Sequence, residues 1–423
     1  MVDSDVVDDA AMTPPGDALR RRLGLTDSVV IGLGSMVGAG IFAALAPAAA
    51  AAGSWLLLAL AVAALLAYCN ATSSARLAAR YPVSGGTYVY GRERLGAFWG
   101  YLAGWGFVAG KTASCAAMAL TVGGYAWPNH SRIVAVAAVV VITGINYTGV
   151  QKSALTTRII VAVVLAVLVV VVGVGLFGNH SAATALPDRI GPRGVLQAAG
   201  LLFFAFAGYA RIATLGEEVR EPRRTIPRAI MIALALALAV YALVAVAALE
   251  VLGSSGLAHA IDPLARVVST AGVSGLAPAV RVGAVLAAAG SLLALILGVS
   301  RTALAMARDR YLPGALAAVH PRFGVPHRAE LAVGAVVAAV AGTFDLRAAI
   351  GFSSFTVLVY YLIANISAAT LTDAEDRPAR WVPFVGAAGC VVVGFSLPIV
   401  SVLTGLAVLA LAAGWFATAR ILR

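Results

Sequence analysis

GSMVGAGIF (residues 34–42) places Gly34, Gly38 and Gly40 in the middle of an apolar block that is long enough to cross a membrane. Glycine weakens a helix, and unwound backbone at membrane depth is tolerated only where protein buries it or it lines a cavity. Backbone amides freed at such a break, followed by a new helix start, are suited to bind an anion such as a carboxylate. Taken alone, the same glycines also fit close helix packing through a small-xxx-small face.

A second glycine-interrupted block favours the broken-helix interpretation. LLFFAFAGYARIATLGEE (residues 201–218) holds Gly208 beside Phe204, Phe206 and Tyr209. The first block begins near residue 27 and the second near residue 195, which matches five spans of about 34 residues each. Interrupted helices at corresponding positions of two halves predict an inverted repeat, because an odd number of spans reverses the second copy. We expect a binding site where spans 1 and 6 meet.

The composition is that of an all-α membrane protein. Of 423 residues, 61% are hydrophobic and 12% are charged, whereas soluble domains are about 25% charged. Apolar blocks of about 18–25 residues suit helices that cross the bilayer, and strands of a membrane barrel would instead show short alternating segments. We predict twelve transmembrane helices, over residues 27–50, 53–74, 97–125, 132–150, 157–178, 195–217, 228–252, 278–304, 328–345, 349–371, 382–397 and 399–419.

The distribution of the basic residues, which give a net charge of +11, fits a membrane topology. With the N-terminus inside, 22 of the 30 basic residues fall in inside loops and tails and only six fall outside. The positive-inside rule then predicts a multi-pass protein of the cytoplasmic (inner) membrane with both termini cytoplasmic. No nucleic-acid partner is expected, because the basic residues neither cluster on one helix nor alternate with aromatic residues.

Four segments divide the predicted chain. Residues 1–26 are expected to form a disordered cytoplasmic tail, acidic at first and then basic at Arg20–Arg22, without the apolar core of a signal peptide. Residues 27–178 form the first five-helix repeat and residues 195–371 the second, inverted one. Residues 382–423 supply two additional helices and the C-terminal tail.

Motifs for catalysis or cofactor binding are missing from the sequence. There is no GxxxxGK[ST], HExxH or GxSxG motif, and Cys69, Cys115 and Cys390 lie inside apolar blocks without metal-ligand spacing. All five histidines fall in predicted loops, so none is expected to relay protons within the membrane. We therefore expect no enzyme activity, no metal and no cofactor.

Four stretches together resemble the amino acid–polyamine–organocation superfamily of permeases, which share the LeuT-type fold of five plus five helices with helices 1 and 6 broken. The stretches are GSMVGAGIF, ARYPVSGGTYVYGRERLG (residues 79–96) followed by Gly104-Trp105, FAFAGYARIATLGEEVREPRRTIPRAI (residues 204–230) and SRTALAMARDRYLP (residues 300–313). The resemblance implies a secondary transporter of amino acids that works by alternating access, through proton symport or exchange. Spans 1, 2, 6 and 7 would rock against a scaffold of spans 3, 4, 8 and 9.

The resemblance also implies how substrate binds. The backbone of the first break would hold the substrate carboxylate, and carbonyl groups of the second break would hold the amino group. Phe206 resembles an aromatic gate over the substrate, against the alternative of a lipid-facing or core phenylalanine. The positions concerned are Ser35, Met36, Val37, Gly38, Ala39 and Gly40 in the first break and Phe204, Ala205, Phe206, Ala207 and Gly208 in the second.

Three residues are candidates for coupling or specificity. Val164 stands where many relatives carry a span-5 lysine that replaces sodium, so Lys111 in span 3 is predicted to take over that role. Desolvation favours its neutral form, which would allow Lys111 to titrate. Arg211, one turn beyond the second break, is a candidate for substrate specificity, and Ser291 in span 8 for ion or lysine contacts. Glu217 and Glu218, beside Arg220, fit an inside gate or a solvated charge cluster.

Two other functions share these features. A permease for polyamines or other organic amines would have the same fold, but no carboxylate at mid-membrane depth is available for a second amine. A membrane sensor that binds ligand without transporting it is the other alternative. The sequence does not select the amino acid, the coupling ion or the oligomeric state.

Overall fold

The computed structural model describes residues 23–82, 85–149, 154–178, 191–213 and 218–421, and these are helical with no strand beyond one isolated bridge between Leu23 and Val219. Most of the predicted tail therefore lies outside the described residues. The helices are α1 (Leu25–Val37), α2 (Gly40–Ala52), α3 (Leu56–Arg80), α4 (Thr87–Leu95), α5 (Ala97–Ala126), α6 (Ser131–Tyr147), α7 (Ala154–Phe177), α8 (Pro192–Phe206), α9 (Ala210–Ala213), α10 (Pro222–Ala258), α11 (Pro263–Thr270), α12 (Ala277–Arg308), α13 (His327–Thr343), α14 (Leu346–Ala369), α15 (Trp381–Ser396) and α16 (Ile399–Ile421).

Long apolar helices confirm a multi-pass membrane protein. Eight stretches of the described residues are long and apolar enough to cross a membrane. The first, Leu25–Arg80, has 56 residues, and because one crossing needs only about 20 residues, it is long enough for more than one. The most exposed large apolar side chains are spread over α6, α7, α15 and α16 and suit a lipid environment, among them Ile133, Val169, Phe384 and Leu411.

Two helices occupy segments that the sequence pattern left as loops. α4 lies between Gly86 and Gly96, whose φ angles of 59° and 102° favour glycine and bound the helix at both ends. α11 begins with Pro263 at its first position, where proline is well tolerated. Both helices are too short to span a membrane, so a search for apolar blocks of about 20 residues does not reveal them.

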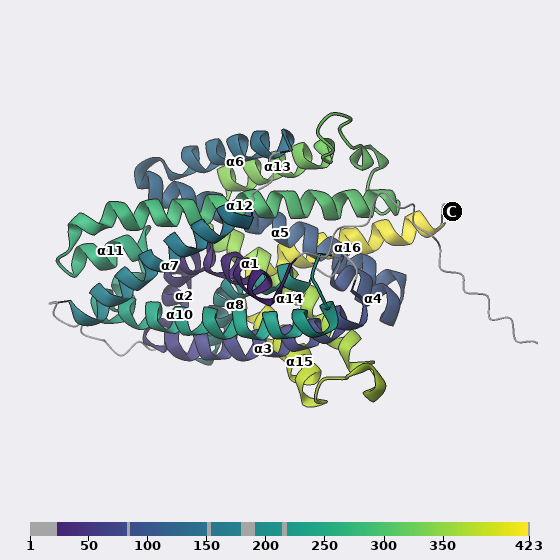
Figure 1. The fold of residues 1–423 in the computed structure, drawn as a ribbon, viewed down its shortest axis with the longest axis horizontal. Helices are drawn as coiled ribbons and strands as arrows, with labels where there is room; N and C mark the ends of the chain where they lie inside the picture. The colour runs from purple at the N-terminus through teal and green to yellow at the C-terminus, as the bar shows by residue number, and fades with distance from the viewer. Residues whose placement is uncertain (1–22, 83–84, 150–153, 179–190, 214–217, 422–423) are drawn as a thin grey trace, which may run out of the picture.

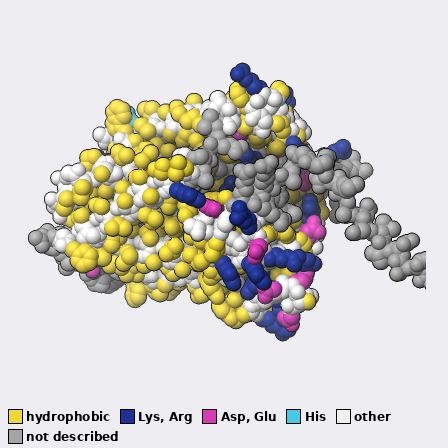
Figure 2. Space-filling view, viewed as in Figure 1, with side chains coloured by type: hydrophobic (Ala, Val, Ile, Leu, Met, Phe, Trp, Pro, Cys, Tyr) yellow, Lys and Arg dark blue, Asp and Glu magenta, His cyan; other side chains and the backbone are white. Residues whose placement is uncertain are grey.

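The helices run roughly along the long axis of the molecule (Figure 1), with α4 and the C-terminal end of α16 at one end and α11 at the other. Apolar side chains cover most of the visible face, and Lys, Arg, Asp and Glu gather toward the end that carries α4 (Figure 2). Within the bundle, α14 and the α8–α9 stretch are mostly buried, whereas α6, α7 and α16 are mostly exposed. The broken helices thus lie at the centre.

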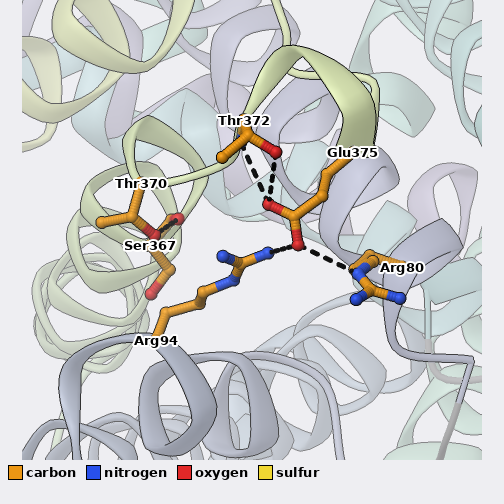
Figure 3. A network of polar contacts seen from close by, with 6 residues as sticks. All are labelled: Arg80, Arg94, Ser367, Thr370, Thr372 and Glu375. Carbon is orange, nitrogen blue, oxygen red and sulfur yellow. Dashed lines mark hydrogen bonds and ion pairs between the residues drawn. The ribbon is translucent and has the colours of Figure 1, made fainter.

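The charged end is fastened by what we call the Glu375 cluster: Arg80, Arg94, Thr372 and Glu375 (Figure 3). The Glu375 carboxylate accepts hydrogen bonds from Arg94 Nη2, from Arg80 Nε at 3.1 Å and from the Thr372 amide at 3.0 Å. These bonds, that from Arg94 above all, lower the pKa of Glu375 to about 2. The cluster ties the end of α3 and the helix α4 to the loop that follows α14.

Candidate functional site

The first break falls where the glycine pattern predicts it. α1 ends at Val37, Gly38 adopts φ −56° and ψ −113°, and α2 starts at Gly40 after Ala39. A glycine is required at Gly38 because a Cβ there would collide with the Ser291 hydroxyl of α12. Ser291 therefore lies against the first break.

The second break is a tightening of the helix rather than an open gap. α8 ends at Phe206, the 3₁₀ turn η3 covers Ala207–Tyr209, and the one-turn helix α9 follows. A 3₁₀ turn in the middle of a helix changes the hydrogen-bond ladder and leaves carbonyls available to side chains. The predicted interruption at Gly208 is therefore present in a compact form.

The two breaks touch each other through their backbones. A Cβ at Gly208 would lie 2.7 Å from the amide nitrogen of Met36, and a Cβ at Gly40 would lie 2.6 Å from the Cα of Ala205. Real Cβ atoms do not approach backbone so closely, so these glycines permit the contact. The structure thus brings together the two sets of predicted site residues.

Tyr241 of α10 connects the breaks and was missed by the sequence analysis. Its hydroxyl donates to the Met36 carbonyl at 2.6 Å and lies 3.0 Å from the Ala205 carbonyl, so its single proton serves both. The Tyr241 ring is 1% exposed and packs edge-on against Phe206, with ring centroids 5.0 Å apart. A tyrosine within an otherwise aliphatic block, LALAVYALV (residues 236–244), was the available signal.

The remaining residues of the breaks are almost entirely enclosed. Phe206 is fully buried, so of the alternatives for this side chain a lipid-facing position is wrong. Ser35 is partly exposed and donates to the Ile31 carbonyl at 2.8 Å, within its own helix. The other positions are buried, namely Met36, Val37, Ala39, Phe204, Ala205 and Ala207.

Lys111 of α5 reaches the second break. Its side chain is buried, and its ammonium nitrogen lies 3.5 Å from the Ala207 carbonyl, at the long limit of a hydrogen bond. Val164 is buried in α7 and offers no charge. The contact therefore places the one lysine predicted to lie within a span against a carbonyl of the predicted amino-group site.

Arg211 lies on α9, directly after the 3₁₀ turn of the second break. Its side chain is exposed. The Glu218 carbonyl accepts from the Leu23 amide at 3.0 Å, and the Arg220 amide donates to the Leu23 carbonyl at 2.9 Å. This pairing joins the segments that flank the two broken helices, while Glu217 lies outside the described residues.

Apolar side chains line the space beside the breaks. Ile41, Leu45, Leu60, Leu202 and Ala245 face a pocket that leaves no room for a water molecule in this conformation. Among the residues that the structure describes, no three His, Cys, Asp or Glu side chains are grouped to hold a metal ion. The site offers backbone dipoles, one lysine and an apolar wall.

Comparison with known proteins identifies a family that covers nearly the whole chain. The sequence model of a family described as amino acid permease matches residues 23–421. An uncharacterized transporter of Mycobacterium tuberculosis is 68% identical, covering 96% of this chain and 93% of its own length. A branched-chain amino acid permease of Bacillus subtilis is 26% identical over 94% of this chain and 88% of its own length. The human cationic amino acid transporter 4 is 29% identical, over 85% of this chain and 61% of its own length.

The relatives carry the names of transporters and permeases, and the apolar helices agree with those names. The match extends over both helix breaks and nearly all of the described helices. The chain is therefore a multi-pass membrane transporter and belongs to the amino acid permease family.

Proposed function

We propose that this protein is a secondary active transporter that moves amino acids across the cytoplasmic membrane by alternating access at the two helix breaks. The observation that carries the proposal is the backbone-to-backbone contact of the breaks, through Gly208 on Met36 and Gly40 on Ala205. Irregular backbone buried at membrane depth is expensive unless it serves a site.

The proposed topology has twelve crossings, with both termini cytoplasmic. In it, α1–α2, α3, α5, α6 and α7 form one repeat (27–178), and α8–α9, α10, α12, α13 and α14 form the inverted second repeat (195–371), before α15 and α16 (382–423). The gathering of basic side chains at the α4 end (Figure 2) supports a cytoplasmic location of that end.

The proposed substrate is an α-amino acid with an apolar side chain. Its carboxylate would bind the amides of residues 38–40 at the start of α2, and its amino group the carbonyls of residues 204–207. The aliphatic pocket wall supports an apolar side chain, in line with the relative named for branched-chain amino acids. Phe206 is proposed as the gate, and Arg211 and Ser291 as residues that tune substrate choice.

Lys111 is proposed to link transport to its driving ion or exchange partner. Its ammonium group lies at the Ala207 carbonyl, which the substrate amino group would also use. A substrate that binds there competes with Lys111, and a neutral Lys111 amine leaves the carbonyl more readily than a charged one. Proton coupling and exchange both follow from that competition.

Uptake by purified protein in proteoliposomes tests the function. Labelled leucine, isoleucine, valine, lysine and arginine are supplied with and without an inward-acid pH gradient, and with unlabelled amino acid preloaded inside. We expect saturable uptake of the apolar amino acids. Stimulation by the gradient indicates proton symport, and a requirement for preloading indicates exchange. Binding without uptake under all these conditions contradicts a transporter and supports a sensor.

The Lys111→Met variant tests the coupling role. It keeps the length of the side chain but removes the charge, and we expect uptake to lose its dependence on the gradient or on preloading. Lys111→Arg is the matched control that keeps a permanent charge. Uptake in Lys111→Met with the parent's rate and pH dependence contradicts the role.

A further inference from the structure

Glu330 of α13 is the most deeply buried carboxylate with no assigned role in the described chain. The residue is fully buried, and both carboxyl oxygens lack a hydrogen-bond partner among the described residues. Burying a carboxylate away from water without hydrogen bonds strongly disfavours its charged form. The side chain therefore needs a partner that the rest of the protein does not supply.

Two polar atoms on the neighbouring helix α6 are likewise buried without a hydrogen-bond partner among the described residues. They are Thr143 Oγ1 and Asn146 Oδ1. Asn146 is held in place on its other side, since its Nδ2 donates to the Leu293 carbonyl of α12 at 3.1 Å. An acceptor oxygen of a fixed amide suits a protonated carboxyl group, which carries an O–H donor.

Contacts on both sides of Glu330 place it opposite these residues. One turn before it, the His327 ring lies 6.2 Å from the ring of Tyr147 on α6. One turn after it, a Cβ at Gly334 would lie 2.7 Å from the Thr143 side chain. Positions three and four residues apart share a helix face. Glu330 therefore lies between these contacts on α13, as Asn146 does on α6.

His327 is the first residue of α13 and lies three residues before Glu330. Its Nδ1 atom is buried and has no partner among the described residues, and its ring lies 5.3 Å from that of His320. His320 Nδ1 accepts from the amides of Arg322 and Phe323, which leaves Nε2 as the proton-bearing atom of the neutral ring. The imidazole rings of His320 and His327 are thus neighbours at the start of α13, one helical turn before Glu330.

Arg301 is the charge that acts on this carboxylate most directly. It attracts Glu330 from α12 without an ion-pair contact within the described residues. The elements packed on α13 carry further titratable or charged groups. These are Arg132 and Tyr147 on α6, Tyr101, Lys111, Cys115 and Tyr125 on α5, Arg281 and Arg308 on α12, His320 in the preceding loop, and His327 and Arg328 on α13 itself.

We propose that Glu330 is a proton-binding site buried between α6, α12 and α13. The link between this site and transport rests on the proposed function. Protonation of Glu330 itself can be measured without transport. A physical connection to the helix breaks exists: Asn146 bonds Leu293, and Ser291 on the same helix packs against Gly38.

Infrared difference spectroscopy of the purified full chain during a pH titration tests the site directly. We expect the carbonyl band of a protonated carboxylic acid to appear as the pH falls and to be missing in Glu330→Gln. Glu250→Gln, which changes an exposed glutamate in α10, is the matched control and should retain the band.

A band present at every pH would mean a permanently neutral acid, and a band absent at every pH a carboxylate held by Arg301; either result overturns the proposal. If Glu330→Gln fails to fold, labelling of the parent with a hydrophobic carbodiimide replaces it, since this reagent attacks protonated buried carboxyl groups. Modification of Glu330 that rises on acidification supports the proposal, and modification independent of pH overturns it.

Proteoliposome uptake then tests the link to transport. We expect Glu330→Gln to lose the pH response of uptake while Glu250→Gln keeps it. An unchanged pH response in Glu330→Gln overturns the link. If the protein transports nothing, the proposed function is contradicted. The infrared titration still tests whether Glu330 binds a proton.

Discussion

The helix-break centre and the Glu375 cluster both join segments far apart in the sequence, but by different forces. At the centre, Gly208 and Gly40 bring backbone against backbone, and one tyrosine hydroxyl bridges two carbonyls. At the charged end, a carboxylate gathers two arginines and a backbone amide where water and salt have access. Contacts of the first kind depend on shape and those of the second on charge.

This difference predicts opposite sensitivities. Close packing tolerates little added volume, and nothing in the solvent can replace a buried hydrogen bond. Ion pairs near water are weakened by salt and by protonation of the acid, and they contribute little individually. We therefore expect large, salt-independent effects at the centre and small, salt-dependent effects at the charged end.

Gly208→Ala should have the largest effect. The added methyl group meets the backbone of Ser35 and Met36, which cannot rotate away as a side chain can. Overpacking of this kind costs roughly 1–3 kcal/mol or more, and we expect loss of uptake together with a lower Tm of the purified protein.

A second glycine gives the matched control for that result. The closest contact of a Gly38→Ala methyl group is the Ser291 side chain, with the Gly34 carbonyl oxygen at 3.1 Å, so Gly38→Ala combined with Ser291→Gly should recover folding and part of the uptake. Equal damage in the single and double variants would show that Gly38 is needed for its backbone conformation, and Gly208→Ala with parental Tm and uptake would contradict the close backbone contact.

Tyr241→Phe should have an intermediate effect. The ring and its contact with Phe206 stay, but the Met36 and Ala205 carbonyls lose their shared donor. Polar contacts between membrane helices are worth roughly 0.5–2 kcal/mol, so Tm should fall at both low and high salt. Tyr101→Phe removes a buried hydroxyl without a partner among the described residues and should leave Tm nearly unchanged. Equal Tm shifts in the two variants would argue against the bridge.

Glu375→Gln should have the smallest effect and the only one with a strong pH dependence. The folded protein lowers the pKa of Glu375 from 4.5 to about 2. A lowered acid pKa stabilises the fold above the unfolded value, and this contribution is lost as the pH falls from about 4.5 toward 2. The parent and the variant should thus differ in Tm at neutral pH and low salt and converge on acidification or in high salt. A difference that persists at low pH would contradict the ion-pair origin.

Local features of the sequence were enough to locate the helices. The predicted apolar segments coincide with helices or, at α1–α2 and α8–α9, with broken helices, because the length of an apolar block and the presence of glycine are properties of a short stretch. Helix lengths were less accurate. α10 begins at Pro222 and continues to Ala258 across a kink at Gly253, where φ is 66°, so it exceeds the predicted 228–252 at both ends.

The prediction that every histidine lies in a loop was wrong for His327, which is the first residue of α13. The end of an apolar block marks where hydropathy falls, whereas a helix continues as long as its backbone hydrogen bonds do. Helix termini that project from the apolar region, such as those carrying His327 and Arg80, are therefore placed by the structure alone.

The sequence by itself determined the class of protein, the positions of the two breaks and the candidate backbone site, since glycine, charge and hydropathy act locally. Only the tertiary structure showed that Tyr241 joins the breaks, that Lys111 reaches the Ala207 carbonyl and that Glu330 is buried without a hydrogen-bond partner among the described residues. The physical reason is that lipid tails are as apolar as a protein interior. Hydropathy along a membrane helix therefore does not tell the face that meets lipid from the face that meets another helix.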